Sequence, residues 1–516
     1  MKIMIAYPPL ENEKGTPLLG QNRQFQWFND PTYIYPVIPA SAATLLAKNG
    51  FQVIWADGIA EEWSYDQWLD FVKQERPDLI AMETKTPVVK EHWRIIDDLK
   101  QLLAPHTSLL TVLFGDHVTA LPEESMQSSQ VDFVLTGGNY DFLLLNLCNH
   151  LENFQNSSLP TPRSSPDLEP GIYYRANGEI KNTGPFELNQ NLNSLPFIDR
   201  NLTKWQLYSH KNGNYKKTPG TYIMSGRDCW WRSDGGCTFC SWPTLYPRFQ
   251  KRTPENVLDE IGTLIEKYEV KEIMDDTGTF PTGKWLTSFC QGMIERGYNK
   301  RVSLDCNMRF GVLNQEDWNL MAKAGFRLIL FGLESANQET LDRINKNVKV
   351  EEIIRGVRMA KKAGLAPHIT VMVGYPWETN ADIERTLELS RQLFREGCVD
   401  TLQATIVIPY PGSRLYLEAQ EKGWLRFNNN WERYDMAEPV LTSPIDPQKL
   451  MSFTYSLYQS FITPRFILKK IVTVRSFDDL KFLYRASKAV LGHWRDFKHL
   501  SAKREIQNLE SSKSKV

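Results

Sequence analysis

The sequence contains no apolar run that approaches the roughly 20 residues a membrane-spanning helix requires. Its amino terminus, MKIMIAYPPL, is too short and too soon interrupted by prolines to read as a secretory signal. The 516 residues carry a net charge of −1, so the basic excess typical of nucleic-acid-binding proteins is missing too. We therefore expect a cytoplasmic protein that has no nucleic-acid partner.

Cysteine is scarce, with seven in the whole chain, yet three lie within twelve residues of the segment GRDCWWRSDGGCTFCSW: Cys229, Cys237 and Cys240. In a reducing compartment, grouped thiols indicate a metal site or catalysis before a disulfide. A structural zinc site needs four ligands, but no histidine lies between His210 and His368. The pattern favours an iron–sulfur cluster held by three thiolates with one iron left open. A zinc site and three structural cysteines are the alternatives.

The first 152 residues alternate between apolar strand-like runs and helical patterns. Strands are expected at 2–7, 51–57, 78–83, 108–115 and 131–137. Strands that alternate with crossover helices predict an α/β fold with a doubly wound, Rossmann-like parallel sheet. Ligands of such sheets bind at the carboxyl ends of the strands.

A Pro/Ser-rich connection follows at 153–219, and GIYYRANGEIKN within it predicts a small hairpin around Asn177 and Gly178. The βα alternation then resumes over 220–425. Its six expected strands are 221–226, 270–276, 302–308, 326–335, 367–376 and 401–410. They predict a (β/α)6 partial TIM barrel, with the cysteine segment on the catalytic side at the carboxyl ends of the strands. A helical region is expected at 426–505 and a disordered tail at 506–516.

Several segments of this second unit carry recognisable motifs: CTFCSW, DDTGTFP, LDCNMRF, FGLESANQETLDRINK, VMVGYPWET and FITPRFILKKI. Together they resemble the cobalamin-binding-domain radical S-adenosylmethionine (SAM) enzymes, a group that includes methyltransferases and the anaerobic magnesium-protoporphyrin cyclase. The resemblance spans about residues 1–475. One departure is the cysteine spacing, which is C-x7-C-x2-C here and C-x3-C-x2-C in most of the family. Cys306 or Cys290 is the alternative to Cys229 as the first ligand.

The resemblance implies a [4Fe–4S] cluster on Cys229, Cys237 and Cys240, with SAM bound at the open iron. The positions that match the SAM-contacting motifs are Phe239, Asp275, Asp276, Arg309, Glu334, Ser335 and Gly374. Phe239 is expected near the adenine, while Glu334 and Ser335 reach the ribose or the amino group. Arg309 is expected at the carboxylate, which a guanidinium can bind as a bidentate fork.

The resemblance also implies cobalamin on the first domain. The D-x-H-x-x-G motif is absent, because the first loop reads YPPLENEKG, so no histidine there can ligate cobalt. We expect cobalamin to bind without a histidine ligand. The residues expected to line it end the predicted strands: Pro9, Glu83, Thr84, Thr86, Gly115, His117, Thr119, Gly137 and Gly138. For His117, a local hydrogen bond in its loop is the alternative.

The leading hypothesis for function is a methyltransferase that moves a methyl group from methylcobalamin to an unactivated carbon after hydrogen abstraction by a 5′-deoxyadenosyl radical. Cobalamin-dependent oxidative cyclisation or rearrangement is one alternative, and a non-catalytic corrinoid sensor is another. The expected partners are a small-molecule or lipid-like substrate and an electron donor such as a flavodoxin or ferredoxin. The basic and apolar carboxyl-terminal stretch is expected to pack on the barrel, and peripheral contact with a membrane is the alternative.

Overall fold

The protein is described here from a computed structural model. The described residues are 1–10, 12–19, 25–103, 109–155, 168–232 and 235–461, with 468, 472, 474, 479–485 and 487–488. The expected tail at 506–516 lies outside them, as does most of the chain beyond 461. Within the described residues, no helix is both long and apolar enough to cross a membrane.

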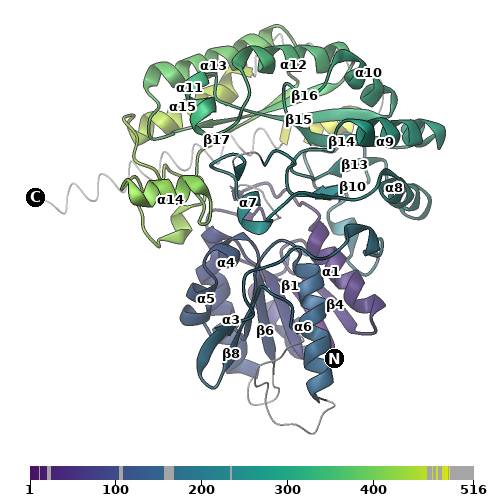
Figure 1. The fold of residues 1–516 in the computed structure, drawn as a ribbon, viewed down its shortest axis with the longest axis vertical. Coiled ribbons are helices and arrows are strands. Elements are labelled where there is room, and N and C mark those ends of the chain that lie inside the picture. Colours follow the sequence, from purple (N-terminus) through teal and green to yellow (C-terminus); the bar gives the residue numbers. More distant parts are fainter. Residues whose placement is uncertain are drawn as a thin grey trace, which may run out of the picture.

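The first unit is built on a seven-stranded sheet in the order β4-β1-β5-β6-β7-β8-β9, which lies in the lower half of Figure 1. Its strands are β1 (Lys2–Tyr7), β4 (Gln52–Asp57), β5 (Leu79–Glu83), β6 (Leu110–Phe114), β7 (Phe133–Leu135), β8 (Ile172–Ala176) and β9 (Glu179–Asn182). The five strands from β4 to β7 in the sheet order pair in parallel with their neighbours, which confirms the doubly wound sheet. Their side chains are almost entirely buried, as expected for strands covered by helices on both faces.

The hairpin β8–β9 lies where the sequence predicts one, but it is part of the first sheet rather than of a separate connection. It pairs antiparallel to β7 and extends the first sheet at its edge. The pairing is between segments some 40 residues apart, and no local pattern in the sequence indicates it.

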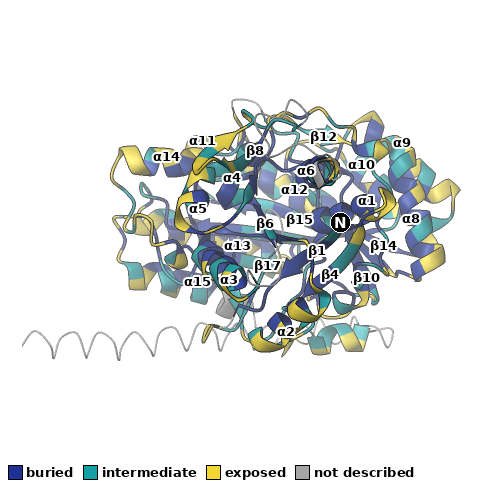
Figure 2. Ribbon diagram, turned by 90° about the horizontal axis from the view of Figure 1, so that it is seen from below, coloured by how far each residue is buried: buried dark blue, intermediate teal, exposed yellow. Residues whose placement is uncertain are grey.

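Helices cover the first sheet and leave their outer sides exposed, which Figure 2 shows as yellow over dark blue strands. These elements are α1 (Val37–Lys48), α2 (Tyr65–Glu75), η1 (Thr86–Val88), α3 (Val89–Leu103), α4 (Asp116–Ala120), α5 (Pro122–Ser128) and α6 (Tyr140–Gln155). Ser64 begins α2 with a capping box. A small ribbon, β2 (Thr16–Pro17) with β3 (Trp27–Phe28), lies in the loop after β1.

The second unit is an open barrel of six parallel strands in sequence order, in the upper half of Figure 1. The strands are β10 (Gly220–Ile223), β13 (Glu272–Asp275), β14 (Ser303–Met308), β15 (Phe326–Glu334), β16 (Ala366–Val373) and β17 (Thr401–Ile406). Every neighbouring pair is parallel, so the six-stranded partial barrel is confirmed. The ribbon β11 (Gly226–Arg227) with β12 (Gln250–Lys251) brackets the cysteine segment.

Helices follow the barrel strands along the chain, and the first of them lies next to α4 of the first unit rather than on the outer side of the barrel. They are α7 (Trp242–Leu245), α8 (Pro254–Tyr268), α9 (Lys284–Glu295), α10 (Gln315–Lys323), α11 (Gln338–Arg343), α12 (Val350–Lys362), α13 (Asn380–Arg395), α14 (Arg414–Glu421) and α15 (Pro447–Phe461). Short 3-10 turns are η2 (Leu192–Ser194), η3 (Trp205–Leu207), η5 (Tyr298–Lys300) and η6 (Trp431–Arg433). From 425 to 446 the chain is mainly irregular, so the expected carboxyl-terminal helices begin only at Pro447.

Candidate active site at the carboxyl ends of the barrel strands

The cysteine segment lies directly after β10 and β11, on the side of the barrel where parallel-barrel enzymes bind their substrates. The turn that carries Cys237 and Cys240 is fixed by its backbone. The Thr238 N–H donates to the Ile344 carbonyl at 3.0 Å, and the Leu415 N–H donates to the Thr238 carbonyl at 2.9 Å. The turn is therefore joined both to the loop after α11 and to the start of α14.

Cys229 lies just after β11, at the start of the longer loop that leads to Cys237. Burial raises the pKa of the Cys229 thiol, and Cys237 raises it further, while a Thr279 hydroxyl 3.0 Å from Sγ opposes this shift. Burial also raises the pKa of Cys240 well above its ordinary value, with further contributions from Cys237 and Cys229. Each thiol thus lies within range of its neighbours' charge, and all three are free cysteines.

Among the described residues, no three His, Cys, Asp or Glu side chains come together closely enough to hold a single metal ion. A [4Fe–4S] cluster places each thiolate on a separate iron, so its ligands surround a larger volume than one ion does. Three free thiols that influence one another's pKa suit such a spread-out ligand set. A bound metal removes the proton from a coordinating thiol, so the raised pKa values do not prevent coordination.

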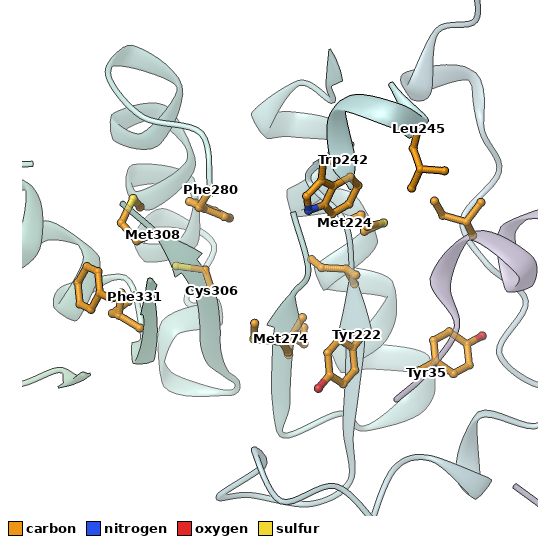
Figure 3. Packing of buried hydrophobic residues seen from close by; sticks show 14 of the residues in the cluster. Tyr35, Tyr222, Met224, Trp242, Leu245, Met274, Phe280, Cys306, Met308 and Phe331 are labelled. Carbon is orange, nitrogen blue, oxygen red and sulfur yellow. The ribbon is translucent and has the colours of Figure 1, made fainter. Parts of the chain in front are cut away.

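The two alternative ligands are placed elsewhere. Cys306 is fully buried in β14 within an apolar cluster with Met274, Met308 and Phe280, as Figure 3 shows. Cys290 is buried on the outer helix α9, where burial raises its pKa to about 12. Neither can replace Cys229 without rearrangement of the barrel.

Several of the buried polar atoms without a hydrogen-bond partner belong to the barrel segments that carry the motifs. They are Thr238 Oγ1, Arg309 Nε, Tyr375 Oη and Glu378 Oε2. Buried polar groups are nearly always hydrogen-bonded, so unpartnered atoms in these motifs indicate a place for a polar ligand. The chemistry and the position of these residues fit a cluster with SAM beside it.

Glu334 ends β15 with φ +62, a left-handed conformation that is costly for a residue other than glycine. One oxygen of its carboxylate lies 2.7 Å from Nζ of Lys346, and both side chains are buried. Burial disfavours the Lys346 ammonium, but Glu334 and Cys237 outweigh it and raise the pKa of this lysine. The Lys346 ammonium also lies 6.0 Å from the centre of the Phe239 ring, which brings two of the predicted SAM residues to one point.

Arg309, predicted at the carboxylate of SAM, lies at the end of β14. Its guanidinium stacks on the Trp231 ring with 4.5 Å between their centres, and Nη2 donates to the Lys346 carbonyl. Beside it opens a cavity of about 910 Å³, which is in the size range of small-molecule sites. Its wall includes Trp230, Trp231, Arg309, Phe310 and the 347–352 loop. The long interval between Cys229 and Cys237 therefore contributes two aromatic side chains, Trp230 and Trp231, to the wall of this cavity.

The remaining predicted SAM residues hold the strand ends together. Asp275 accepts hydrogen bonds from Ser225 and Thr277, and burial raises its pKa to about 6. Asp276 donates its N–H to the Ile223 carbonyl at 2.8 Å and is buried. The Ser335 hydroxyl donates to Glu378 at 3.0 Å, which joins the GLES and GYPWET motifs. Gly374 has φ +95, a conformation that favours glycine.

The nine residues predicted to line cobalamin do meet at the carboxyl edge of the first sheet, and eight of them are buried. Protein groups occupy that edge. A Cβ on Gly138 would lie 2.0 Å from the Tyr246 ring, and one on Gly137 would lie 2.3 Å from Phe186. The Tyr246 hydroxyl donates to the Gly138 carbonyl at 3.1 Å. The edge has the predicted residues, and two aromatic rings lie directly against its glycines.

Gly115, Thr84 and Thr119 illustrate how closely that edge is packed. A Cβ on Gly115 would lie 2.3 Å from the Thr84 carbonyl oxygen. The Thr119 hydroxyl donates to the Gly115 carbonyl at 2.7 Å and accepts from the Gly137 N–H at 3.0 Å. Pro9 packs against Gly58, since a Cβ there would lie 2.7 Å from the proline ring.

His117 is fully buried and both of its ring nitrogens have partners: Thr86 at 3.2 Å and Glu124 at 3.2 Å. Trp431 of η6 donates to the other oxygen of Glu124 at 2.9 Å. Both ring nitrogens of His117 are thus engaged within the protein, which is the local hydrogen bonding given above as the alternative role of this residue. Glu83 accepts hydrogen bonds from Tyr7 and Tyr140, and burial raises its pKa.

Sequence reasoning did not select Lys346, Tyr375 and Thr279. The Thr279 hydroxyl lies 3.0 Å from the Cys229 sulfur, Lys346 pairs with Glu334, and the Tyr375 hydroxyl is buried without a partner. Lys346 ends the FGLESANQETLDRINK segment, and Tyr375 lies inside VMVGYPWET. Both segments are among those that resemble the family, so the positions next to the matched residues could have been included in the predicted site.

Comparisons with known proteins agree with this geometry. Residues 224–390 match the radical SAM superfamily, which implies a [4Fe–4S] cluster and SAM. An uncharacterised methyltransferase of Pyrococcus horikoshii is 25% identical over 476 residues, covering 91% of this chain and 95% of its own. The anaerobic magnesium-protoporphyrin IX monomethyl ester cyclase of Rubrivivax gelatinosus is 23% identical over 462 residues, or 88% and 78% of the two chains.

Two solved structures share the fold over nearly the whole chain. TsrM from Kitasatospora setae, a radical SAM methyltransferase solved with cobalamin and a [4Fe–4S] cluster, has a TM-score of 0.66 at 14% identity, covering 95% of this chain and 99% of its own. The cobalamin-dependent radical SAM enzyme OxsB has a TM-score of 0.65 at 15% identity, covering 96% and 71%. The chain therefore contains a radical SAM domain and resembles, over most of its length, the cobalamin-binding-domain group of radical SAM enzymes.

Proposed function

We propose that the protein is a radical SAM methyltransferase that uses cobalamin as the carrier of the methyl group. The observation that supports this most directly is the place of Cys229, Cys237 and Cys240 in the segment after β10 and β11, at the carboxyl side of the barrel, together with unpartnered buried polar atoms in the barrel motifs. The similarity of the whole chain to a protein named as a methyltransferase favours methyl transfer over other radical chemistry.

The residues of the chain have defined tasks in this proposal. Cys229, Cys237 and Cys240 would hold a [4Fe–4S] cluster, which supplies the electron that cleaves SAM to a 5′-deoxyadenosyl radical. Phe239 and Gly374 would shape the place for the adenosine part of SAM, and Glu334 would accept hydrogen bonds from its polar groups. Trp230 and Trp231 would exclude water from the cluster on its outer side.

Cobalamin would bind at the edge formed by the nine residues of the first sheet, with no histidine on cobalt. Tyr246 and Phe186 lie against Gly138 and Gly137 at that edge, so the two rings would border the corrin. A flavodoxin or ferredoxin is the proposed electron donor, and a small-molecule or lipid-like compound is the proposed substrate. Peripheral contact with a membrane is part of the lipid alternative, and the cytoplasm is the proposed location.

Anaerobic turnover of the reconstituted protein with metabolite extracts tests this function. A methyltransferase produces both 5′-deoxyadenosine and S-adenosylhomocysteine, and its product gains one methylene unit in mass. Oxidative cyclisation, which the cyclase relative favours as the second candidate, gives 5′-deoxyadenosine without S-adenosylhomocysteine. A protein that binds corrinoid but takes up no cluster and forms no 5′-deoxyadenosine would instead be a sensor.

A further inference from the structure

The described residues beyond α15 present large apolar side chains to water. Leu468, Val472, Leu480 and Tyr484 have exposed fractions of 62%, 79%, 53% and 71%. They are half of the eight large apolar side chains that are exposed among the described residues, although all four fall within 468–484. Exposed apolar side chains are ordinary when they are scattered singly, but a group of them marks an interaction site.

The spacing of these side chains places them in pairs on helix faces. Leu468 and Val472 are both helical and four residues apart. Leu480 and Tyr484 are also four residues apart, within the helical residues 479–485. Side chains at this spacing are neighbours on one face of a helix. Leu480 and Tyr484 therefore form a short apolar strip, which we call the outer strip.

The helix that carries the outer strip is held on the barrel by its other side. Arg485 Nη2 donates to the carbonyls of Tyr215 and Lys216 at 3.0 and 3.3 Å, just before β10 and so at the amino end of the barrel. Asp479 pairs with Nζ of Lys216 at 2.6 Å. At about 3.6 residues per turn, Asp479 and Arg485 lie opposite the outer strip. The protein thus fixes this helix with the apolar strip directed to water.

Positive charge accompanies the outer strip. Lys481 and Lys488 are helical, exposed, and three and four positions from Tyr484, the spacing at which helix side chains are neighbours. Lys488 also reaches Asp30 of the first unit at 2.9 Å. Residues 462–505 carry eleven Lys or Arg and four Asp or Glu, which gives +7 in a chain whose net charge is −1. The positive charge of the protein is therefore concentrated where the apolar side chains are exposed.

The surface of an anionic lipid bilayer matches both properties. Helices with lysines beside an exposed apolar face lie in the headgroup region, and anionic lipids attract clustered basic residues. A nucleic acid would use the positive charge but would leave the outer strip without a role. A second copy of the same surface would bring two cationic segments together, which is unfavourable. The combination of charge and apolar exposure thus favours the bilayer.

We propose that the helix at 479–485 binds the surface of an anionic lipid bilayer, with the outer strip inserted among the headgroups and the two lysines beside the lipid phosphates. Leu468 and Val472 supply a second apolar contact. Because the helix is fixed to the barrel, binding would hold the whole protein in one orientation on the membrane. Vesicle binding needs neither cluster nor SAM, so its failure and the failure of the proposed function are separate results.

Co-sedimentation of the full-length protein with vesicles tests this surface. The wild type should bind vesicles that contain about one-third phosphatidylglycerol at least about tenfold more tightly than vesicles of phosphatidylcholine alone. Most of this preference should disappear when the salt concentration is raised from about 0.1 M to about 1 M, because screening then acts within about 3 Å.

Substitutions separate the apolar from the charged contribution. Leu480→Ser combined with Tyr484→Ser removes the outer strip and should weaken binding to the anionic vesicles by about tenfold or more. Lys481→Glu should weaken the same binding by about tenfold and leave binding to phosphatidylcholine unchanged. Leu102→Ser combined with Leu417→Ser, which changes two exposed leucines of α3 and α14, should bind as the wild type does. The midpoint of thermal unfolding, measured for each variant, shows that the fold is kept.

Wild-type affinity in the protein that carries both serines at the outer strip would overturn the proposal, as would equal binding of the wild type to the two kinds of vesicle. If that variant does not fold, wild-type affinity in Lys481→Glu would have the same meaning. A wild type that binds neither vesicle, but forms dimers that loss of the outer strip abolishes, would show instead that the strip joins two copies of the chain.

Discussion

Glu378 is a buried carboxyl that connects two barrel motifs. It accepts hydrogen bonds from the hydroxyls of Ser335 at 3.0 Å and Thr340 at 3.1 Å, while its second oxygen has no partner. Burial raises its pKa to about 7, although the two hydroxyls oppose the shift. The folded protein therefore retains a proton that the unfolded chain has released above its ordinary pKa of 4.5.

This residue predicts a pH dependence of stability. With a raised carboxyl pKa, the stabilising contribution is complete below about pH 4.5 and is lost as the pH rises through 7. Glu378→Gln cannot titrate, so the fall in unfolding free energy between pH 5 and 7 should be smaller by roughly 2–3 kcal/mol. Urea unfolding at several pH values measures it.

The exposed Glu388→Gln serves as the control and should keep the wild-type slope. Asp57, Asp228 and Asp275, whose pKa values burial raises to about 6, continue to contribute in both proteins. Equal slopes in Glu378→Gln and the wild type would show that Glu378 does not hold the proton.

Cys229 gives a second prediction at this scale. Cys229→Ala should lower the iron content of the reconstituted protein and abolish formation of 5′-deoxyadenosine, because two thiolates do not hold a SAM-binding cluster firmly. Iron analysis and chromatography of SAM products check this. Cys398→Ser, which changes a half-buried thiol beside Glu396, should leave both quantities unchanged. Full iron in Cys229→Ala would mean that another residue is the third ligand.

At the scale of elements, a buried ion pair joins the two units. Arg227 of β11 donates to both oxygens of Asp141 at the start of α6, and also to Asn139 at 2.7 Å. The exposed fractions of the two charged side chains are 4% and 0%. Water cannot reach either charge, so each depends on the other.

Asp141→Ala should therefore destabilise the protein by about 3–5 kcal/mol, since it leaves the Arg227 charge buried and unpaired. Thermal or urea unfolding measures the loss. Asp259→Ala removes the partner of Arg296 in an exposed pair and should cost less than about 1 kcal/mol. Replacing both Arg227 and Asp141 with apolar residues should restore much of the stability, and failure to do so would mean that packing rather than charge explains the loss.

For the whole molecule, the aromatic ring that lies on the edge of the first sheet leads to a binding prediction. Tyr246→Ala removes the ring that lies on Gly138 and so opens part of the volume that a corrin needs. We expect this variant to bind aquacobalamin more tightly than the wild type by about tenfold, in absorbance titrations. Tyr298→Ala, on the outer side of the barrel, should not change the affinity. Weaker binding in Tyr246→Ala would mean that the ring itself contacts the corrin.

The sequence predicts local structure better than it predicts contacts between distant segments. The five parallel strands of the first sheet, the six of the barrel and the position of the cysteine segment follow from local periodicity, and the structure has them. Contacts between distant segments do not follow from it. Gly138 meets Tyr246 across 108 residues, and Trp431 reaches Glu124 across 307. The contacts that Gly138 and His117 make with the protein itself therefore could not be predicted from the sequence.

The cysteine turn has a consequence for exposure to oxygen. Cys240 is separated from Tyr246 by only five residues, and the Gly138 N–H donates to the Leu245 carbonyl at 2.8 Å. The segment that would lose its iron when a cluster is oxidised is thus the same one that rests on the first domain. Loss of iron would therefore weaken the contact between the two units. Proteases should then cut the oxidised protein between its halves sooner than they cut freshly reconstituted protein.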